Sequence, residues 1–330
     1  MREYLIRRLL FLIVVLLGIS IISFVVINLP PGDFLTTYIT NLEARGIQVD
    51  AEIARALRTR YGLDQPLVRR YFTWMGNLLR GDFGESFVYN RPARDVLFAR
   101  IPMTALLALI TLIFELAVAI PIGVYSAVKQ YSIGDYIATV FGFIGLAIPN
   151  FLLALVLMFF FFHTFGVLPG GLFSPEYRDA AWSFARVMNM FRHLWVPVIV
   201  IGTAGTAGTI RVMRAMLLDE LGKDYVKTAI SKGVPKWKVI FRHPFRVSLN
   251  PIISTIGWLL PAIISGEAIV SVVLNLPTTG PVMLEALRSQ DMYLAGSFVM
   301  MLSVLTVIGT LVSDILLAVI DPRIRYESKA

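Results

Sequence analysis

Long apolar stretches dominate the chain and are separated by shorter polar segments. The first stretch, Leu9–Leu29, carries no charged residue, and its length is about what an α-helix needs to cross a bilayer. Five further stretches of this kind follow, at Ile101–Val128, Tyr136–Phe162, Leu194–Ile210, Leu249–Leu276 and Leu294–Ile320. Leu194–Ile210, the fourth of the six stretches, is the shortest and is rich in small residues. The pattern predicts an all-α integral membrane protein with six transmembrane helices.

The first apolar stretch also has the features of a secretory signal peptide, because Arg7 and Arg8 precede it. It is too long for the apolar region of such a peptide, however, and no small-x-small cleavage site follows it. We therefore expect residues 1–29 to remain as the first transmembrane helix.

The amino-acid composition excludes several classes of protein and several kinds of site. The chain is 57% hydrophobic and 16% charged, whereas a soluble domain is about one-quarter charged. Cysteine is absent, which excludes disulfides, Cys-ligated zinc and thiol nucleophiles. The three histidines have no metal-ligand spacing, and no catalytic constellation stands out. We expect no catalytic residue and no metal site, and membrane lipid rather than nucleic acid around the chain despite its net charge of +8.

The distribution of Lys and Arg predicts the orientation in the cell (inner) membrane. The N-terminus, the C-terminus and two connections on the same side carry 16 of them, nine in residues 211–248, against four in two short connections on the other side. An excess of basic residues marks cytoplasmic connections, while long loops cross regardless of charge. We therefore expect an extracytoplasmic segment 30–100, a five-helix core 101–320 and a tail 321–330, with both termini in the cytoplasm.

Segment 30–100 contains signals for two helices and a turn. Asp50 is placed to cap a helix over Ala51–Tyr61 that Gly62 ends. Pro66 suits the first turn of a second helix through Leu79, and residues 80–86 have the composition of a turn. The segment serves either as a structural cap or as a docking surface for a partner outside the cell.

Residues 211–248 predict a helix–turn–helix that protrudes into the cytoplasm. Leu218, Leu221, Tyr225 and Ala229 share one face of a helix over 212–232. Gly233 is placed to end that helix, and Pro235 to start another over Lys236–Val247. This hairpin has a net charge of +6, from nine basic and three acidic residues. Anionic lipid is one possible partner, but a surface-lying helix needs a wide apolar face, and the mixed surface favours a protein groove.

Three acids fall inside predicted spans: Glu115, Glu267 and Asp314. A charge in the membrane centre costs at least ~2.5 kcal/mol, so each acid deserves a functional hypothesis. An ion-coupled carrier would use them as a relay. The alternative is a structural pair for Glu115, and a cavity-lining or helix-pairing role for Glu267 and Asp314. A run of small residues at 202–209 is interpreted as a site of close helix packing.

Several motifs occur in order from the first helix to the C-terminus: Leu29-Pro30-Pro31-Gly32-Asp33, Gly81-Asp82-Phe83-Gly84-Glu85-Ser86, Ile148-Pro149-Asn150-Phe151, Asp224-Tyr225-Val226-Lys227-Thr228-Ala229, Lys232-Gly233, Arg242-His243 and Asp321-Pro322-Arg323. Together they resemble the dipeptide/oligopeptide branch of the ABC importer permeases, over nearly the whole chain. The resemblance implies the type I ABC importer permease fold. It also implies a loop that couples to an ATPase, here with the residues Tyr225, Lys227, Thr228, Ala229, Lys232, Gly233, Val234, Pro235 and Arg242.

The family further implies the partners: a second homologous permease subunit, two cytoplasmic ABC ATPases and an extracytoplasmic substrate-binding protein. No cofactor is expected on this chain, because ATP and Mg would be bound by the ATPases. The resemblance therefore implies a transport subunit that is not an enzyme and that imports di- or oligopeptides. Oligosaccharide import by the same machinery, and an ion-coupled secondary transporter, stay open as alternatives.

The sequence departs from the family pattern at three places. The family's Glu-Ala-Ala position reads Lys227-Thr228-Ala229, without its acid. Pro244 follows His243 where a small residue is usual, and it is expected to bend the second hairpin helix. The acid that the family often has before a later proline is replaced by Ser271, while Glu267 lies one helical turn earlier on the same face.

Overall fold

The computed structural model describes residues 2–29 and 64–320, together with the single positions 35, 36, 39, 52, 55, 58 and 59. Apart from positions 52, 55, 58 and 59, which are helical, the residues of the helix expected over Ala51–Tyr61 lie outside the described residues, as do its cap Asp50 and its end at Gly62. The tail 321–330 lies outside them as well.

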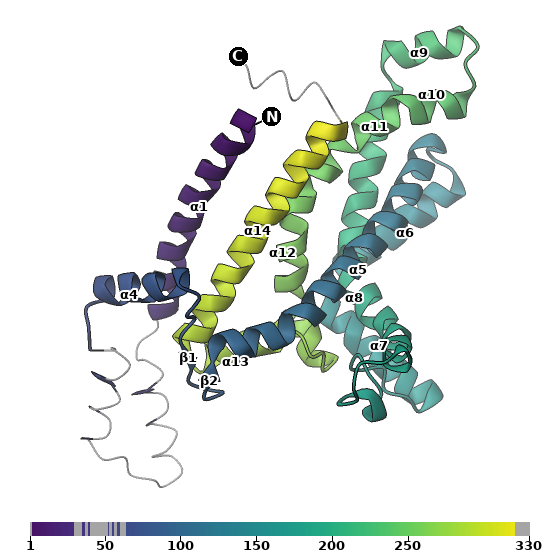
Figure 1. The fold of residues 1–330 in the computed structure, drawn as a ribbon. Helices are drawn as coiled ribbons and strands as arrows, with labels where there is room; N and C mark the ends of the chain where they lie inside the picture. Colours follow the sequence, from purple (N-terminus) through teal and green to yellow (C-terminus); the bar gives the residue numbers. More distant parts are fainter. Residues whose placement is uncertain are drawn as a thin grey trace. The chain divides into compact units, whose positions relative to one another are not determined.

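The described chain forms two compact units (Figure 1). The larger one comprises Thr104–Pro277 and residues from Thr306 onward, and the smaller one Arg2–Met103 and Thr278–Leu305. Two helices run from one unit into the other, α5 (Ala93–Val128) and α14 (Met292–Ile320). The larger unit also contains α6 (Ile133–Ala147), α7 (Asn150–Phe165), the 3-10 turn η1 (Pro175–Tyr177), α8 (Phe184–Leu221), α9 (Asp224–Ser231), α10 (Lys236–Arg242), α11 (Pro244–Ser248) and α12 (Asn250–Val273).

Several described helices are long and apolar enough to cross a membrane. Three qualify singly: α5, α8 and the Met292–Ile315 part of α14; a bent pair of helices counts as a fourth if it forms one span. The prediction of an all-α, multi-pass membrane protein is thereby confirmed. Six spans stay a prediction, because among the described residues α12 and α1 (Arg2–Asn28) show only shorter apolar runs.

The third predicted span is not one continuous helix. The prediction of a single helix over Tyr136–Phe162 is wrong, because α6 ends at Ala147 and α7 leaves it at an angle of 102°. Pro149 has no backbone N–H and disfavours a helical conformation at the residue before it. Ile148 is accordingly extended, with ψ 120°. This pair is either a broken span or a re-entrant loop.

Two other spans are longer than the apolar pattern indicates. α5 starts at Ala93 rather than at residue 101, and α8 covers Phe184–Leu221 rather than Leu194–Ile210. Both helices continue through polar residues beyond their apolar stretches. Hydropathy detects only the apolar part of a helix, so it does not indicate these extensions. Ser183 accepts a hydrogen bond from the Arg186 backbone N–H (3.2 Å) and thereby caps α8.

Small residues let the helices of the larger unit approach closely, as the run at 202–209 predicts. A Cβ atom on Gly205 would collide with the Glu115 carboxyl group, and one on Gly202 would lie 3.0 Å from the ring of Phe114. A Cβ atom on Gly145 of α6 would lie 2.9 Å from Thr203. The interpretation as helix packing is therefore confirmed. α8 packs against α6, α7, α11 and α12 and forms the centre of this unit.

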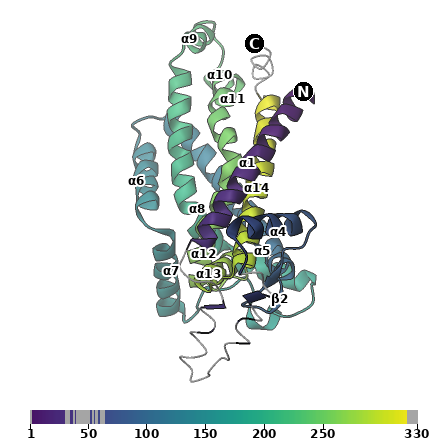
Figure 2. The same ribbon diagram turned by 90° about the vertical axis from the view of Figure 1, so that its left-hand side faces the viewer.

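The smaller unit contains α1, α4 (Leu67–Leu79), the strands β1 (Glu85–Ser86) and β2 (Arg91–Pro92), and α13 (Thr279–Arg288). The helix expected from Pro66 to Leu79 is confirmed as α4, and α4 lies across the C-terminal end of α1 in both views (Figures 1 and 2). Phe24, Trp74 and Met300 form a buried cluster between α1, α4 and α14.

A two-stranded hairpin follows α4, which the sequence did not predict beyond its opening turn. Glu85 pairs with Pro92 and Ser86 with Arg91. The Ser86 hydroxyl donates to buried Asp291 (2.7 Å), and Tyr89 donates to Glu285 of α13 (2.5 Å). Burial and this carboxylate raise the pKa of Tyr89 to about 12, so its hydroxyl stays a donor at neutral pH.

Candidate functional site

The predicted cytoplasmic hairpin is present as two short helices beyond the end of α8. Figures 1 and 2 both show α9 and α10 projecting past α8 and α12. The first hairpin helix was predicted to be continuous over 212–232, and this is wrong, because α8 ends at Leu221, Lys223 is extended and α9 begins at Asp224; the chain then returns through α10. The second helix was predicted to reach Val247 with a bend at Pro244; the bend is confirmed, but the single helix is wrong. α10 ends at Arg242, and α11 begins at Pro244, because proline cannot supply the N–H that a continuous helix needs.

The bend of the hairpin is set by Gly233, as the sequence predicts. Its φ is +77°, a conformation that residues with a Cβ atom rarely adopt. The Gly233 N–H donates to the Ile230 carbonyl (2.9 Å) and the Val234 N–H to the Ala229 carbonyl (3.2 Å), so the last carbonyls of α9 are satisfied. A Cβ atom at Gly233 would meet nothing within 4 Å. Backbone conformation, rather than lack of space, is therefore what requires glycine here.

Pro235 fixes the start of the return helix. Its φ of −55° fits a helix start, and its carbonyl accepts from the Val239 N–H (3.0 Å). Each hairpin helix buries one valine, Val226 in α9 and Val239 in α10. The hairpin is thus a folded unit with a defined turn.

Large apolar side chains lie exposed on the hairpin among basic ones. Trp237 and Phe241 are 67% and 50% exposed and, four residues apart, lie on the same face of α10. Ile230 of α9 is also exposed. The basic residues around them are likewise exposed: Lys227, Lys232, Lys236, Lys238 and Arg242. This surface combines aromatic anchors with positive charge, as protein interfaces often do.

The remaining predicted residues of this loop have local partners. The Thr228 hydroxyl donates to the Asp224 carbonyl (2.8 Å), and Lys227 pairs with the Asp224 carboxylate (2.9 Å) on the surface. Tyr225 lies at the base of the hairpin, where its side chain is exposed but its hydroxyl contacts Glu220 of α8. The predicted residues therefore fall into two groups, those that shape the hairpin and those that face outward.

Glu220 anchors the hairpin to α8, a role that the sequence analysis missed. Glu220 is buried at the end of α8; the Tyr225 hydroxyl donates to it (2.6 Å), and Lys223 also pairs with it. Burial and the neighbouring carboxylate raise the pKa of Tyr225 well above its usual range, so Tyr225 remains a donor. An acid five residues before a tyrosine was the available signal, but it was counted only as charge.

A second ion pair holds the start of α6 to α8. Arg214 donates to both carboxylate oxygens of Asp135, each at 2.9 Å, and Asp135 also accepts from the Tyr131 backbone N–H (2.9 Å). Bidentate pairs of this kind have a fixed geometry. In the sequence Arg214 stands out only as a basic residue, because its partner Asp135 is 79 positions away.

The three intramembrane acids lie on three different helices. Glu115 of α5 is buried and accepts a hydrogen bond from Thr209 of α8 (2.7 Å). Glu267 of α12 is fully buried, as is Ser271 one turn later, and Asp314 of α14 is half-buried. In the part of the chain that the structure describes, no group of three or more His, Asp or Glu side chains could hold a metal ion. The geometry of Glu115 is that of a helix–helix contact.

Known proteins resemble this chain along almost its full length. The family described as "Binding-protein-dependent transport system inner membrane component" matches residues 119–326, and its N-terminal companion family matches residues 1–108. The oligopeptide transport system permease protein AppB of Bacillus subtilis is 37% identical, over 99% of this chain and 100% of the relative. The dipeptide transport system permease protein DppB of Alkalihalophilus pseudofirmus is 30% identical, with 99% and 100% covered.

A third relative has a similar level of identity. The oligopeptide transport system permease protein OppB of Haemophilus influenzae is 29% identical, over 99% of this chain and 100% of the relative. Both the core with the hairpin and the N-terminal region are thus matched by the same kind of protein. The chain therefore belongs to the family of binding-protein-dependent transport system inner membrane components, the permease subunits of ABC importers.

Proposed function

We propose that this permease subunit forms, with a second homologous permease subunit, a path for di- or oligopeptides that an extracytoplasmic binding protein delivers. The relatives described above are named for oligopeptide and dipeptide transport, which favours peptides over oligosaccharides. Two ABC ATPases in the cytoplasm supply the energy and bind ATP and Mg. The N- and C-termini and the hairpin lie on the cytoplasmic side.

The exposed aromatic pair on α10 is the observation that carries this proposal. Trp237 and Phe241 leave apolar area in water that an ATPase groove would bury, and burial of that area stabilises the complex. The surrounding Lys and Arg side chains orient the hairpin toward an acidic rim. An ion-coupled secondary carrier has no evident use for such a surface. The hairpin and the membership of the importer family therefore both favour an ATP-driven importer.

The hairpin transmits movement of an ATPase to the spanning helices through its base. Glu220 ties Tyr225 to the end of α8 (2.6 Å), and α8 packs against α6, α7 and α12. A push on α9 and α10 therefore acts on the centre of the larger unit. Glu220 and Tyr225 are positioning residues in this mechanism, whereas Trp237 and Phe241 contact the ATPase.

The intramembrane acids have separate roles in this account. Glu267 and Asp314 line the pathway or pair helices beside it, and Glu115 stabilises the contact between α5 and α8 through Thr209. Because Glu267 lies one turn before Ser271 on α12, it stands in for the family's acid at Ser271. Glu267→Gln in the reconstituted complex is expected to alter peptide transport while leaving ATPase binding unchanged. An unaltered transport rate would make Glu267 a packing residue.

A co-purification experiment tests the proposal. The full chain is purified in mild detergent from its native host, and the bound chains are identified by mass spectrometry. We expect two ATPase chains and a second permease. In the variant Trp237→Ala/Phe241→Ala the ATPases are lost by at least about tenfold, as expected when two aromatic anchors are truncated, while the second permease stays.

The matched control for this experiment is Phe184→Ala, which removes an even more exposed aromatic side chain at the start of α8, far from the hairpin. It is expected to leave both partners bound. Recovery of this chain alone, with solute movement in liposomes that needs no ATP, would overturn the proposed function.

A further inference from the structure

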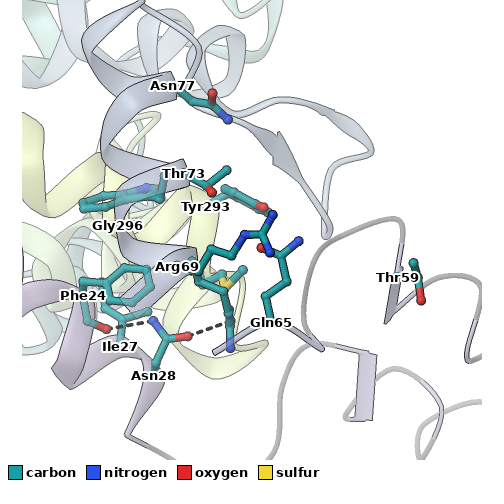
Figure 3. A pocket seen from close by; sticks show the side chains of 13 residues that line it. Phe24, Ile27, Asn28, Thr59, Gln65, Arg69, Thr73, Asn77, Tyr293 and Gly296 are labelled. Atoms are coloured by element: carbon teal, nitrogen blue, oxygen red, sulfur yellow. Dashed lines mark hydrogen bonds between the residues drawn. The ribbon is translucent and has the colours of Figure 1, made fainter. Parts of the chain in front are cut away.

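A cavity lies in the smaller unit where α4 crosses the end of α1. Its volume is about 350 Å³, and its walls come from α1, α4 and the first turns of α14, with Thr59 and Gln65 at one side. Figure 3 shows Arg69 and Gln65 reaching toward one another within it, and Asn28 at its floor. The described function of the hairpin makes no use of this cavity.

The cavity is positively charged. Arg69 and Arg70 both line it, and none of its lining residues is acidic. The Arg70 guanidinium donates to the Asn28 side-chain oxygen (2.8 Å) and to Met292 Sδ (2.8 Å), which fixes its position. Arg69 is exposed, and its guanidinium has no hydrogen bond or ion pair within the described residues. The site therefore contains one fixed cation and one that is available to a ligand.

A buried donor in the same wall points to a missing acceptor. Trp74 lines the cavity and is only 6% exposed, yet its indole Nε1 has no acceptor among the described parts of the chain. A buried indole N–H usually finds a partner, and leaving it without one costs free energy. Gly296 lets the ring lie close, since a Cβ atom there would be 3.1 Å from it. An anion in the cavity would give this donor its acceptor.

The part of the cavity wall that α1 contributes changes from apolar to polar toward the end of the helix. Phe24 and Ile27 belong to the last turns of α1, and Asn28 is its final residue. Preceding residues of α1 expose large apolar side chains, such as Ile22 and Val25, which suit a hydrocarbon environment. The arginines on α4 therefore lie where the bilayer's hydrocarbon ends and its headgroups begin.

α4 itself has the character of a helix that lies in a membrane surface. Val68, Phe72 and Leu79 are exposed and lie together on the side of α4 away from Arg70 and Trp74. Such a helix buries its apolar side in the boundary between headgroups and acyl chains. A small soluble anion would use the arginines but not the apolar wall, whereas a phospholipid uses both.

From these observations we propose that the cavity binds one membrane phospholipid, with its phosphate between Arg69, Arg70 and the Trp74 indole N–H and its acyl region against Phe24 and Ile27. The phosphodiester is an acceptor-only anion that matches two guanidinium groups and an N–H. The lipid joins α1 to α4 and α14. This inference takes from the preceding account only that α1 crosses the bilayer, so it can fail while the hairpin still couples to an ATPase.

Native mass spectrometry of the purified full chain tests the inference. The chain is delipidated and titrated with phosphatidylglycerol, or with a diacylglycerol that has the same acyl chains and no phosphate. We expect one tightly bound phosphatidylglycerol, and at least about tenfold weaker binding of diacylglycerol. Arg69→Gln weakens phosphatidylglycerol binding by about tenfold or more, because a charge-assisted hydrogen bond is lost. Arg80→Gln removes an exposed charge at the end of the same helix and leaves binding unchanged.

A second variant guards against a folding effect. Trp74→Phe keeps the aromatic ring in the cluster but removes the N–H, and it is expected to weaken phosphatidylglycerol binding by several-fold with a similar unfolding temperature. Equal binding by the wild type, Arg69→Gln and Trp74→Phe would overturn the inference.

Three other outcomes would also overturn it. Equal affinity for diacylglycerol would show that the phosphate is not bound. Displacement of the lipid by millimolar inorganic phosphate, with the same dependence on Arg69, would identify a site for free anions. Weaker association of the extracytoplasmic binding protein in Arg69→Gln, with lipid binding unchanged, would identify an acidic protein segment as the occupant.

Discussion

The hairpin of α9 and α10, which we propose to lie in the cytoplasm, and the β1–β2 region, which we propose to lie outside, are built in opposite ways, although both extend beyond the apolar spans. Side-chain hydrogen bonds in the cytoplasmic hairpin join near neighbours, such as Tyr225 to Glu220 and Thr228 to Asp224. In the outer region the Ser86 and Tyr89 hydroxyl groups instead donate to side chains that are far away in the sequence. Ser86 and Asp291 are 205 positions apart, and Tyr89 and Glu285 are 196 apart.

Burial separates the same two regions. Trp237 and Phe241 are exposed on the cytoplasmic hairpin, whereas Ser86, Phe87 and Asp291 are buried in the outer region. A region whose polar side chains hydrogen-bond locally and whose aromatic side chains are exposed to water is suited to binding a partner protein. A region closed by buried long-range contacts is suited to holding its own chain together. Substitutions in the first should therefore affect coupling, and substitutions in the second should affect stability.

The largest expected effect on coupling is that of Gly233→Pro. Proline cannot adopt the φ of +77° found at this turn, so α10 and its aromatic pair are displaced. We expect peptide-driven transport by the reconstituted complex to fall by at least about tenfold, while the chain remains inserted and assembled with the second permease.

Gly233→Asn is the matched control, because asparagine tolerates positive φ and the space at this position is open. Its transport is expected to stay near that of the wild type. Transport by Gly233→Pro at the wild-type rate would show that the hairpin turn has no part in coupling.

In the outer region the largest expected effect is on stability. Gly84 and Gly81 both have positive φ, +77° and +80°, but only at Gly84 would a Cβ atom collide with the Tyr293 ring. Gly81→Ala is therefore expected to cost about 1 kcal/mol for the backbone conformation alone, and Gly84→Ala about 1–3 kcal/mol more for the overpacking. Thermal unfolding of the purified chain measures both. Equal unfolding temperatures for the two variants would contradict the long-range packing described for this region.

The base of the cytoplasmic hairpin should show a smaller effect. Tyr225→Phe removes the donor to buried Glu220, a hydrogen bond to a charged group worth about 1.5–3 kcal/mol, so the peptide-stimulated ATPase rate is expected to fall several-fold. Tyr136→Phe is the matched control, because it removes the hydroxyl of a tyrosine that is exposed on α6, outside the hairpin. A loss in Tyr136→Phe as large as that in Tyr225→Phe would contradict the anchoring role of Glu220.

Short-range signals in the sequence predicted the fold well. Pro66 located α4, Gly233 and Pro235 located the hairpin turn, and the small residues at 202–209 indicated close packing, because each acts through its own backbone or size. The break between α6 and α7 was not predicted, since a proline such as Pro149 is compatible with a kinked span as well as with a sharp turn.

Contacts between residues that are far apart in the sequence could not be predicted from local sequence patterns. The pairs Ser86–Asp291 and Arg214–Asp135 depend on the tertiary fold, and nothing in the local sequence of either partner indicates the other. Glu220 was closer to prediction, because Tyr225 is only five residues away, but its burial at the end of α8 became clear only from the structure.

Photo-crosslinking from position 237 tests the central claim most directly. A benzophenone amino acid replaces Trp237 in the full chain in its native membrane, with position 159 as the control, since Phe159 is similarly exposed on α7. The account predicts a crosslink from position 237 to an ABC ATPase chain, lost in the presence of Gly233→Pro, and none from position 159. Crosslinks from position 237 to lipid alone would contradict it, because the hairpin would then lie on the membrane surface rather than in an ATPase groove.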